Sequence, residues 1–307
     1  CLSKDAKLII AVDNGITAIE QTKYCRDSGC DLIIIDHHQP GKQLPQPSVL
    51  LHSTSACAAG LTWLFCREYT LSCHPERSRG IPPRASLGRD DKLELAAIAT
   101  ICDIVPLLGT NRSIAKFGLE QLNTTRRPGL LALFDVARIR PGNIGAYEVG
   151  FMLGPRLNAM GRLEHAIDSL RILCTKDPAR ARQLAQLLTA TNLKRQTETQ
   201  ISIDHALQQI TVNNILLSAN TSYHPGIIGL IAAKLVETYH RPGLAVSIGE
   251  TISRGSGRSI PGFHLTEFLR QKEKLFIDLG GHALACGFTI STAKLDDLAK
   301  YLATAQI

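Results

Sequence analysis

The sequence predicts an α/β protein in which a parallel-sheet domain is joined by a long helix to a smaller α/β domain. Apolar, strand-like runs at residues 7–12 and 31–35 flank a helical pattern, which is typical of a parallel sheet. Residues 178–210 lack Gly and internal Pro and indicate one helix or two contiguous helices, long enough to bridge domains. Because 307 residues can hold two cores, we expect domains over 1–176 and 213–307 and a connecting helix over 177–212.

The first elements form a β-α-β unit. A buried strand, Lys7–Val12, ends at the turn Asp13-Asn14-Gly15, whose glycine can adopt a positive φ. A helix is expected over residues 17–28 and a second strand over 31–35, joined by a right-handed crossover, so that the strands are parallel. Ligands of such sheets bind at the carboxyl ends of the strands, where Asp13 and Asp36-His37-His38 fall.

The remainder of the first domain is predicted to be mainly helical. A weak strand is expected at 49–51, and helices are expected at 56–69, with Trp63 in the core, and at 92–104, 111–124 and 128–136. Residues 72–91 are rich in Pro, Gly and Arg and lack periodicity, so they are expected to be a disordered insertion, with a basic arm that touches nucleic acid as the alternative. The Gly, Pro and Arg residues of 154–163 predict a loop close to a ligand.

The second domain repeats the alternation of strands and helices. Strands are expected at 214–219 and 243–248, with a turn at 223–226 and a helix at 227–239 between them. Residues 255–259 predict a small-residue turn or an edge strand. A helix at 265–274 precedes the glycine-rich stretch 280–288, which is followed by a strand and a last helix at 294–303.

Composition favours a soluble, cytoplasmic protein. The longest apolar stretches are far shorter than the ~20 residues that a bilayer requires, so no membrane contact is expected. The 9 cysteines show no zinc-binding spacing, which indicates free thiols in a reducing cytoplasm. The net charge of +7 weakly favours a polyanionic partner. No signal-like segment precedes the first strand, and since the chain begins at Cys1 rather than Met, we expect a truncated start.

A group of carboxylates and imidazoles falls where strands or helices end beside the first sheet. An Asp after a strand is more often a turn former or a cap, but adjacent imidazoles after an apolar strand are hard to justify as core residues. Such mixed ligands suit Mn²⁺, Mg²⁺ or Zn²⁺, and two ions about 3.5–4 Å apart could activate water for attack on phosphorus. The candidate catalytic residues are Asp13, Asp36, His37, His38 and Asp103.

Glycine-rich stretches in the second domain favour phosphate binding. Backbone N–H groups that are exposed by missing side chains, together with Arg and His donors, can hold phosphate at Gly280-Gly281-His282 and at Gly255-Ser256-Gly257-Arg258. A tight turn with a capped His explains the first stretch equally well. Arg156 and Arg162 could be surface residues, but their Gly/Pro-rich setting favours a position near a ligand.

These residues resemble the DHH phosphoesterases and, within them, the bacterial RecJ single-strand-specific exonucleases. The motifs occur in the family's order over nearly the whole chain: VDNGI (Val12–Ile16), IDHH (Ile35–His38), ATICDIVPL (Ala99–Leu107), GPRLNAMGRL (Gly154–Leu163), YHPGIIGLIAAKLVE (Tyr223–Glu237), GSGRSIPGFHL (Gly255–Leu265) and GGHALACGF (Gly280–Phe288). The resemblance implies a DHH domain and a DHH-associated domain. It also implies a 5′-to-3′ exonuclease of single-stranded DNA in repair and recombination that uses two divalent cations, Mn²⁺ or Mg²⁺. A monomer is expected, with single-stranded DNA, a helicase and a single-strand-binding protein as partners.

The resemblance also implies a role for each candidate residue. Asp13 would bridge the metals, His37 would bind one of them and Asp103 the other. His38 would face the scissile phosphate, and Asp36 would orient the histidines. Residues that would grip phosphate in the cleft between the domains are Arg156, Ser256, Arg258, His282, Gly280 and Gly281, with Asn158 and Arg162 as weaker candidates.

The chain departs from the family pattern at both ends. The family's first motif, an Asp-x-Asp-x-Asp-like run, and its C-terminal OB-fold are absent. Because that motif supplies metal ligands, we expect negligible nuclease activity with Mn²⁺ from this chain alone. Two alternatives stay open: a phosphodiesterase of short oligonucleotides or small nucleotides, and a catalytically dead nucleic-acid-binding module.

Overall fold

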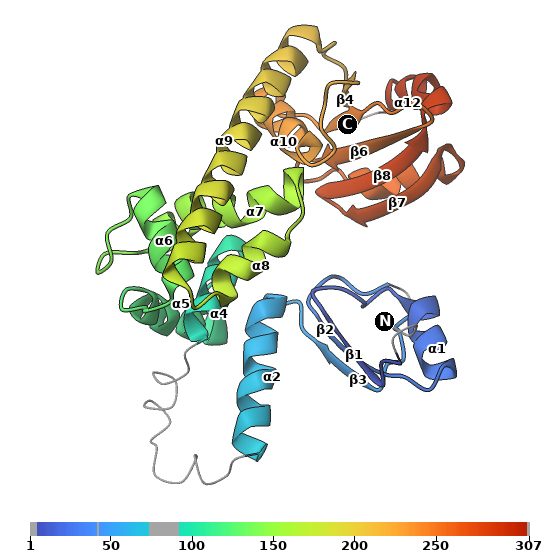
Figure 1. The fold of residues 1–307 in the computed structure, drawn as a ribbon. Helices are drawn as coiled ribbons and strands as arrows, with labels where there is room; N and C mark the ends of the chain where they lie inside the picture. The colour runs from blue at the N-terminus through green and yellow to red at the C-terminus, as the bar shows by residue number, and fades with distance from the viewer. Residues whose placement is uncertain (1–4, 42, 74–91, 306–307) are drawn as a thin grey trace. The chain divides into compact units, whose positions relative to one another are not determined.

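The computed structural model describes residues 5–41, 43–73 and 92–305, whose ribbon is drawn in Figure 1. Contacts divide the chain into a first unit, Cys1–Pro155 with Ile172–Ala185, and a second unit, Arg156–Arg171 with Gln186–Ile307. The predicted insertion lies outside the described residues from 74 to 91. Within the described part of the chain, no helix is both long enough and apolar enough to cross a membrane.

The first unit contains a parallel three-stranded sheet in the order β1-β2-β3. Its strands are β1 (Leu8–Val12), β2 (Asp31–Asp36) and β3 (Val49–His52), and α1 (Ile19–Asp27) connects the first two. Val12 pairs with Ile35, so both strands end at the same edge and the predicted β-α-β unit is confirmed. The prediction that β1 is buried is wrong, since Leu8 is 51% exposed on this edge strand.

Helices make up the rest of the first unit. They are α2 (Ala58–Cys73), α4 (Leu93–Cys102), α5 (Gly109–Leu122), α6 (Pro128–Ala137) and the π-helical segment η3 (Glu148–Leu153). Trp63 lies in the core with Leu93 and Ile114, as predicted. Helices α4 and α5 approach closely at Gly118, where a Cβ atom would come within 2.8 Å of the Leu93 carbonyl oxygen.

Residues 154–163 form a helix, α7 (Gly154–Leu163), and not the predicted loop. Gly154 and Pro155 directly follow the π-helical segment η3 within one continuous helical run, and neither residue breaks it. Gly154 also packs against the Cys102 side chain, where a larger residue would not fit. The short α8 (Ile167–Cys174) follows. The predicted long helix is confirmed as one continuous element, α9 (Pro178–Gln209), while the predicted domain boundaries stay a prediction.

The second unit is built on a five-stranded sheet in the order β4-β5-β6-β8-β7. Its strands are β4 (Leu216–Asn220), β5 (Gly243–Ser247), β6 (Ile252–Arg258), β7 (Phe276–His282) and β8 (Ala285–Ser291). Its helical elements are α10 (Ile228–Tyr239), α11 (Leu265–Arg270), η4 (Glu273–Leu275), η5 (Thr292–Lys294) and α12 (Leu295–Leu302). Strands β4 and β5 are parallel, whereas the other pairs are antiparallel.

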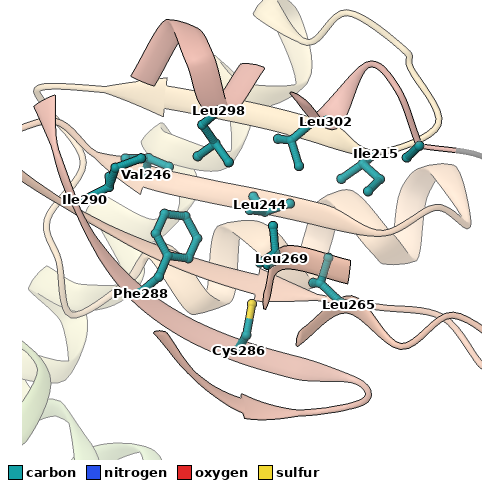
Figure 2. Close-up of a cluster of buried hydrophobic side chains, with 11 residues drawn as sticks. Ile215, Leu244, Val246, Leu265, Leu269, Cys286, Phe288, Ile290, Leu298 and Leu302 are labelled. Atoms are coloured by element: carbon teal, nitrogen blue, oxygen red, sulfur yellow. The ribbon is translucent and has the colours of Figure 1, made fainter. Parts of the chain in front are cut away.

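Strand β6 lies inside this sheet, so the prediction of a turn or an edge strand at residues 255–259 is wrong. The glycines of β6 make room for large neighbours, because Gly255 faces the Phe288 ring and Gly257 faces Leu265 and Cys286. Figure 2 shows Phe288, Cys286 and Leu265 in the core on this side of the sheet. The alternation along β6 therefore sends its glycines to the core and Arg254, Ser256 and Arg258 to the opposite face.

Replacing Gly255 with Ala should destabilise the second unit, because the new Cβ atom would overlap the Phe288 ring. We expect a loss of about 1–3 kcal/mol in the free energy of unfolding, as for other overpacked cores. Gly287→Ala is the matched control, since its Cβ atom would meet no heavy atom within 4 Å and should change stability by no more than about 0.5 kcal/mol. Urea denaturation measures both, and equal stabilities would contradict the proposed packing.

Candidate functional site

The Asp36 carboxylate is a buried anchor at the carboxyl end of β2. The residue is 0% exposed. Its carboxylate accepts hydrogen bonds from the Ile16 N–H at 2.9 Å, the His37 N–H at 2.8 Å, and both the N–H and the Nδ1 of His38. Burial raises the pKa of Asp36, but these hydrogen bonds outweigh it and the net shift is downward. Asp36 therefore stays ionised and fixes the loops that follow β1 and β2.

The His37 ring lies between two carboxylates. Its Nε2 is 3.1 Å from Asp13 Oδ1, and its Nδ1 is 3.4 Å from Asp103 Oδ2. The His37 side chain is 17% exposed, whereas those of Asp13 and Asp103 are 63% and 41% exposed. Residues from the ends of β1, β2 and α4 thus meet at one place in the first unit, as the sequence predicted for this group.

Unusual backbone conformations accompany both carboxylates. Asp13 has a φ of 63°, and its N–H donates to the Ile35 carbonyl at 2.9 Å. Ile104, directly after Asp103, has a φ of 57° and is 88% exposed. Such a conformation costs a β-branched residue about 1–3 kcal/mol, and strain of this size often accompanies functional sites.

The donor atoms fit a divalent metal ion. Potential ligand atoms of Asp13, His37 and His38 all lie within 4.8 Å of one another. Carboxylate oxygens and imidazole nitrogens suit Mn²⁺, Mg²⁺ or Zn²⁺. The sequence prediction had instead joined Asp103 to Asp13 and His37, and Asp103 approaches this cluster through His37 Nδ1.

The electrostatics of the cluster reflect its mixed charge. The net pKa of Asp103 is raised. Burial is the main cause and the charge of Asp13 adds to it, whereas His37 and His38 oppose it. Burial and the charge of Asp103 raise the pKa of the neighbouring Cys102 thiol to about 11, so this thiol is protonated at neutral pH. It donates to the Val149 carbonyl at 3.7 Å. The donors at this site are therefore oxygen and nitrogen atoms.

A cavity of about 640 Å³ in the second unit contains part of the predicted phosphate site. Arg162, Ser256 and Arg258 line it, as predicted from the sequence. Arg258 Nη1 donates to Ser256 Oγ at 3.4 Å and to the Gly257 carbonyl at 2.9 Å. Arg162 Nη1 donates to the Gly226 carbonyl at 3.1 Å. The backbone of α10 closely approaches Ser256 and Arg258, since a Cβ atom on Gly229 would lie 3.3 Å from both Ser256 Oγ and Arg258 Nη2.

In the described part of the chain, the other residues that are predicted to bind phosphate do not line this cavity. Arg156 Nε donates to Thr189 Oγ1 at 3.3 Å, and burial lowers the pKa of Arg156. Asn158 is exposed on α7. Gly280, Gly281 and His282 are exposed at the end of β7. The structure therefore supports no shared cavity for the complete predicted set.

Several residues at the second site escaped the sequence prediction. Burial and the charge of Arg258 lower the pKa of Arg162, and burial and the charge of Arg162 lower that of Arg195 on α9. Arg195 is held by Asn192 Oδ1 at 3.0 Å and lies in an ordinary helical pattern that gave no signal. The cavity is also lined by His224, Arg254, Asp278 and Thr289. Strand pairing and the packing of helices bring these residues together from distant parts of the sequence.

Comparison with known proteins gives family matches to both parts of the chain. Residues 1–100 match the model described as DHH family, N-terminal domain, and residues 208–305 match the DHHA1 domain. The chain is 36% identical, over 95% of its length, to the single-stranded-DNA-specific exonuclease RecJ of Bacillus subtilis. The chain spans 37% of the length of that protein and 55% of the length of the RecJ exonuclease of Dickeya dadantii, to which it is 32% identical. It therefore covers about a third to just over half of the length of these curated relatives.

Solved structures give the same result. The structure of RecJ in complex with Mn²⁺ from Thermus thermophilus matches with a TM-score of 0.85 and 30% identity, over 98% of this chain and 45% of that chain. A structure of exonuclease RecJ bound to manganese matches with a TM-score of 0.80 and 30% identity, over 97% of this chain and 75% of that chain. The α/β fold and the family resemblance predicted from the motifs are therefore confirmed.

Replacing Asp36 with Ala should destabilise the first unit, because buried N–H groups would lose their acceptor. We expect a loss of at least about 2 kcal/mol in the free energy of unfolding at neutral pH. Asp27→Ala, at the exposed end of α1, is the control and should cost no more than about 0.5 kcal/mol. Thermal or urea unfolding measures both variants.

The effect of Asp36 should also depend on pH. Because its pKa is lowered on folding, the stabilisation is complete above the unfolded value of about 3.9 and is lost as pH falls through the folded value. The gap in unfolding free energy between the unmodified protein and Asp36→Asn should therefore narrow below about pH 4. A gap that widens in acid would contradict an ionised Asp36.

Proposed function

The chain belongs to the RecJ group of the DHH family, and from this membership we propose that the protein carrying it is a metal-dependent 5′-to-3′ exonuclease. It would hydrolyse phosphodiester bonds of single-stranded DNA in repair and recombination. The observation that carries the proposal is the position of His37 between Asp13 and Asp103 at the end of a parallel sheet. The relatives named above are single-stranded-DNA-specific exonucleases.

Asp13, His37 and Asp103 would hold two divalent cations, Mn²⁺ or Mg²⁺. RecJ structures from Thermus thermophilus are complexes with Mn²⁺ and with Mg²⁺. A pair of bound divalent ions lowers the pKa of water and stabilises the attacking and leaving oxygens of an in-line displacement. The oxygen and nitrogen donors of this chain match that chemistry.

The protein's own groups would position the substrate. The Nδ1 atom of His38 is bound to Asp36 at 2.7 Å, so its Nε2 is the nitrogen left for a phosphate oxygen. The His38 side chain is 50% exposed, which supports such a contact. Asp36 would act as a positioning residue, since the same carboxylate holds the His37 and His38 backbone.

The cavity of the second unit would bind a phosphate of the DNA strand through Arg162, Ser256 and Arg258. Paired guanidinium groups bind phosphate oxygens through charge-assisted hydrogen bonds. We extend the proposal to further phosphate contacts outside the cavity: Arg156, Asn158, Gly280, Gly281 and His282. A monomer acting in the cytoplasm beside a helicase and a single-strand-binding protein completes the proposal, and the free thiols of the described cysteines support that compartment.

Replacing His37 or Asp103 with Ala in the full-length protein should abolish metal-dependent cleavage of single-stranded DNA. Mn²⁺ affinity, measured by calorimetric titration, should fall at least about tenfold, since an ion would lose a ligand. Binding of single-stranded DNA should stay within about twofold, because the phosphate contacts of the second unit are unchanged. Asp135→Ala, an exposed carboxylate on α6, is the control.

Two results would contradict this assignment. Loss of DNA binding with unchanged Mn²⁺ affinity would make His37 and Asp103 structural residues. Full DNA binding without any cleavage by the unmodified full-length protein would favour a binding module over an enzyme.

Replacing Arg258 with Ala should weaken DNA binding and leave metal binding intact, the reverse of the effect expected for His37 and Asp103. Loss of one phosphate contact should weaken binding of single-stranded DNA by about 10-fold or more and reduce the slope of log affinity against log salt by about one unit. Mn²⁺ affinity should not change. Fluorescence anisotropy at several salt concentrations measures the effect, with Arg270→Ala, an exposed residue of α11, as the control. Tighter binding of dinucleotides than of long strands would support the small-nucleotide phosphodiesterase instead.

A further inference from the structure

A row of polar side chains crosses the sheet of the second unit beside the phosphate site. Arg254 on β6 pairs directly with Thr289 on β8, and Thr289 pairs directly with Asp278 on β7. Directly paired residues on antiparallel strands point to the same face of the sheet. The three side chains therefore form a line with a guanidinium at one end, a hydroxyl in the middle and a carboxylate at the other end.

This row belongs to the same cavity as the proposed phosphate site. Arg254, Thr289 and Asp278 line the cavity together with Ser256 and Arg258. Arg254 precedes Ser256 by two residues on the same strand and faces the same side, which places the two Cα atoms about 7 Å apart. When the phosphate of a molecule is bound at Ser256 and Arg258, the chemical group attached to that phosphate therefore lies beside the row.

The ends of the row do not neutralise each other. Each step between paired strands separates Cβ atoms by about 4.5–5.5 Å, so Arg254 and Asp278 are about 10 Å apart across Thr289. Within the described residues, neither side chain makes a hydrogen bond or an ion pair, and both are exposed. An Arg and an Asp held apart in one cavity are available to a ligand that presents an acceptor to the first and a donor to the second.

The Asp278 carboxylate restricts the chemistry of that ligand. It repels phosphate and accepts hydrogen bonds only from N–H or O–H groups. The sugar of an internal deoxynucleotide has no hydroxyl group, so the donor in a DNA strand must come from a base. Guanine presents O6 and N7 as acceptors for an Arg, and its N1–H and N2 amino group as two adjacent donors for a carboxylate, whereas the one N–H of the thymine base lies between two carbonyl oxygens that repel a carboxylate.

We propose that Arg254, Thr289 and Asp278 form a base-reading subsite that favours guanine over thymine in the nucleotide attached to the bound phosphate. Arg254 donates to O6 or N7, and Asp278 accepts from N1–H or the N2 amino group. Thr289 lies between them and can donate or accept. This inference rests on the proposed function, because it takes the phosphate position from Ser256 and Arg258.

The test is the affinity of the protein for 5′-phosphorylated single strands that differ only in the first base, measured by fluorescence anisotropy in EDTA to prevent cleavage. The strand beginning with guanine should bind roughly fivefold or more tightly than the strand beginning with thymine, the lower range for a good base contact. The preference should fall below about twofold in Asp278→Ala and in Arg254→Gln. It should also vanish when the guanine is moved to the fifth position of an otherwise unchanged strand.

The controls separate base reading from charge. Asp297→Ala on α12 removes one exposed carboxylate, and Arg270→Gln on α11 removes one exposed guanidinium. Both should change the affinity for the two strands equally and leave the ratio intact. Far-UV circular dichroism checks that each variant is folded.

The outcomes distinguish this inference from the proposed function on which it rests. Equal affinity for guanine and thymine, or a ratio that survives in Asp278→Ala, overturns the base-reading subsite while the 5′-phosphate can still strengthen binding. If a 5′-phosphate and a 5′-hydroxyl strand bind equally well and Arg258→Ala has no effect, the phosphate site of the proposed function fails instead.

Discussion

The hydrogen bonds to the buried Asp36 carboxylate are the constraint on which the candidate metal centre depends. One carboxylate binds the Ile16 N–H in the loop after β1 and the His37 and His38 N–H groups in the loop after β2. These loops carry Asp13 and the imidazoles, so their mutual distances follow from a single buried acceptor. An ionised carboxylate is tolerated at 0% exposure only because these donors replace the water that it loses.

The second unit depends on a different constraint, the period-two alternation of β6. Gly255 and Gly257 face large core neighbours, so that Phe288, Cys286 and Leu265 can pack against the backbone. The residues between and beside them are thereby fixed on the opposite face, where they line the cavity. A cluster of small residues that suggests a turn in the sequence is thus a strand that separates a tightly packed core from a polar site.

Local patterns were sufficient for most elements and for the metal cluster. The strand that ends at Asp36 and the continuous α9 follow from periodicity, which the structure preserves. Asp13 and His37 could be grouped because the carboxyl ends of parallel strands share one edge, and Asp103 could be added because it follows the end of a helix beside the sheet. The helix at Gly154–Leu163 could not be predicted from composition, because its Gly and Pro residues are accommodated directly after the π-helical segment η3.

The residues that sequence reasoning missed are those brought together only by tertiary packing. Arg195 reaches Arg162 from another helix. Besides burial, the charge of Arg258 lowers the pKa of Arg162 and the charge of Arg162 lowers that of Arg195, which means that these charges repel. Among the described contacts, Arg195 and Arg162 are held by an amide oxygen and a backbone carbonyl, not by a carboxylate. Such a group carries unbalanced positive charge, and an anion that enters between these side chains relieves the repulsion as well as gaining hydrogen bonds. The proposed phosphate site thus coincides with a cluster of mutually repelling guanidinium groups.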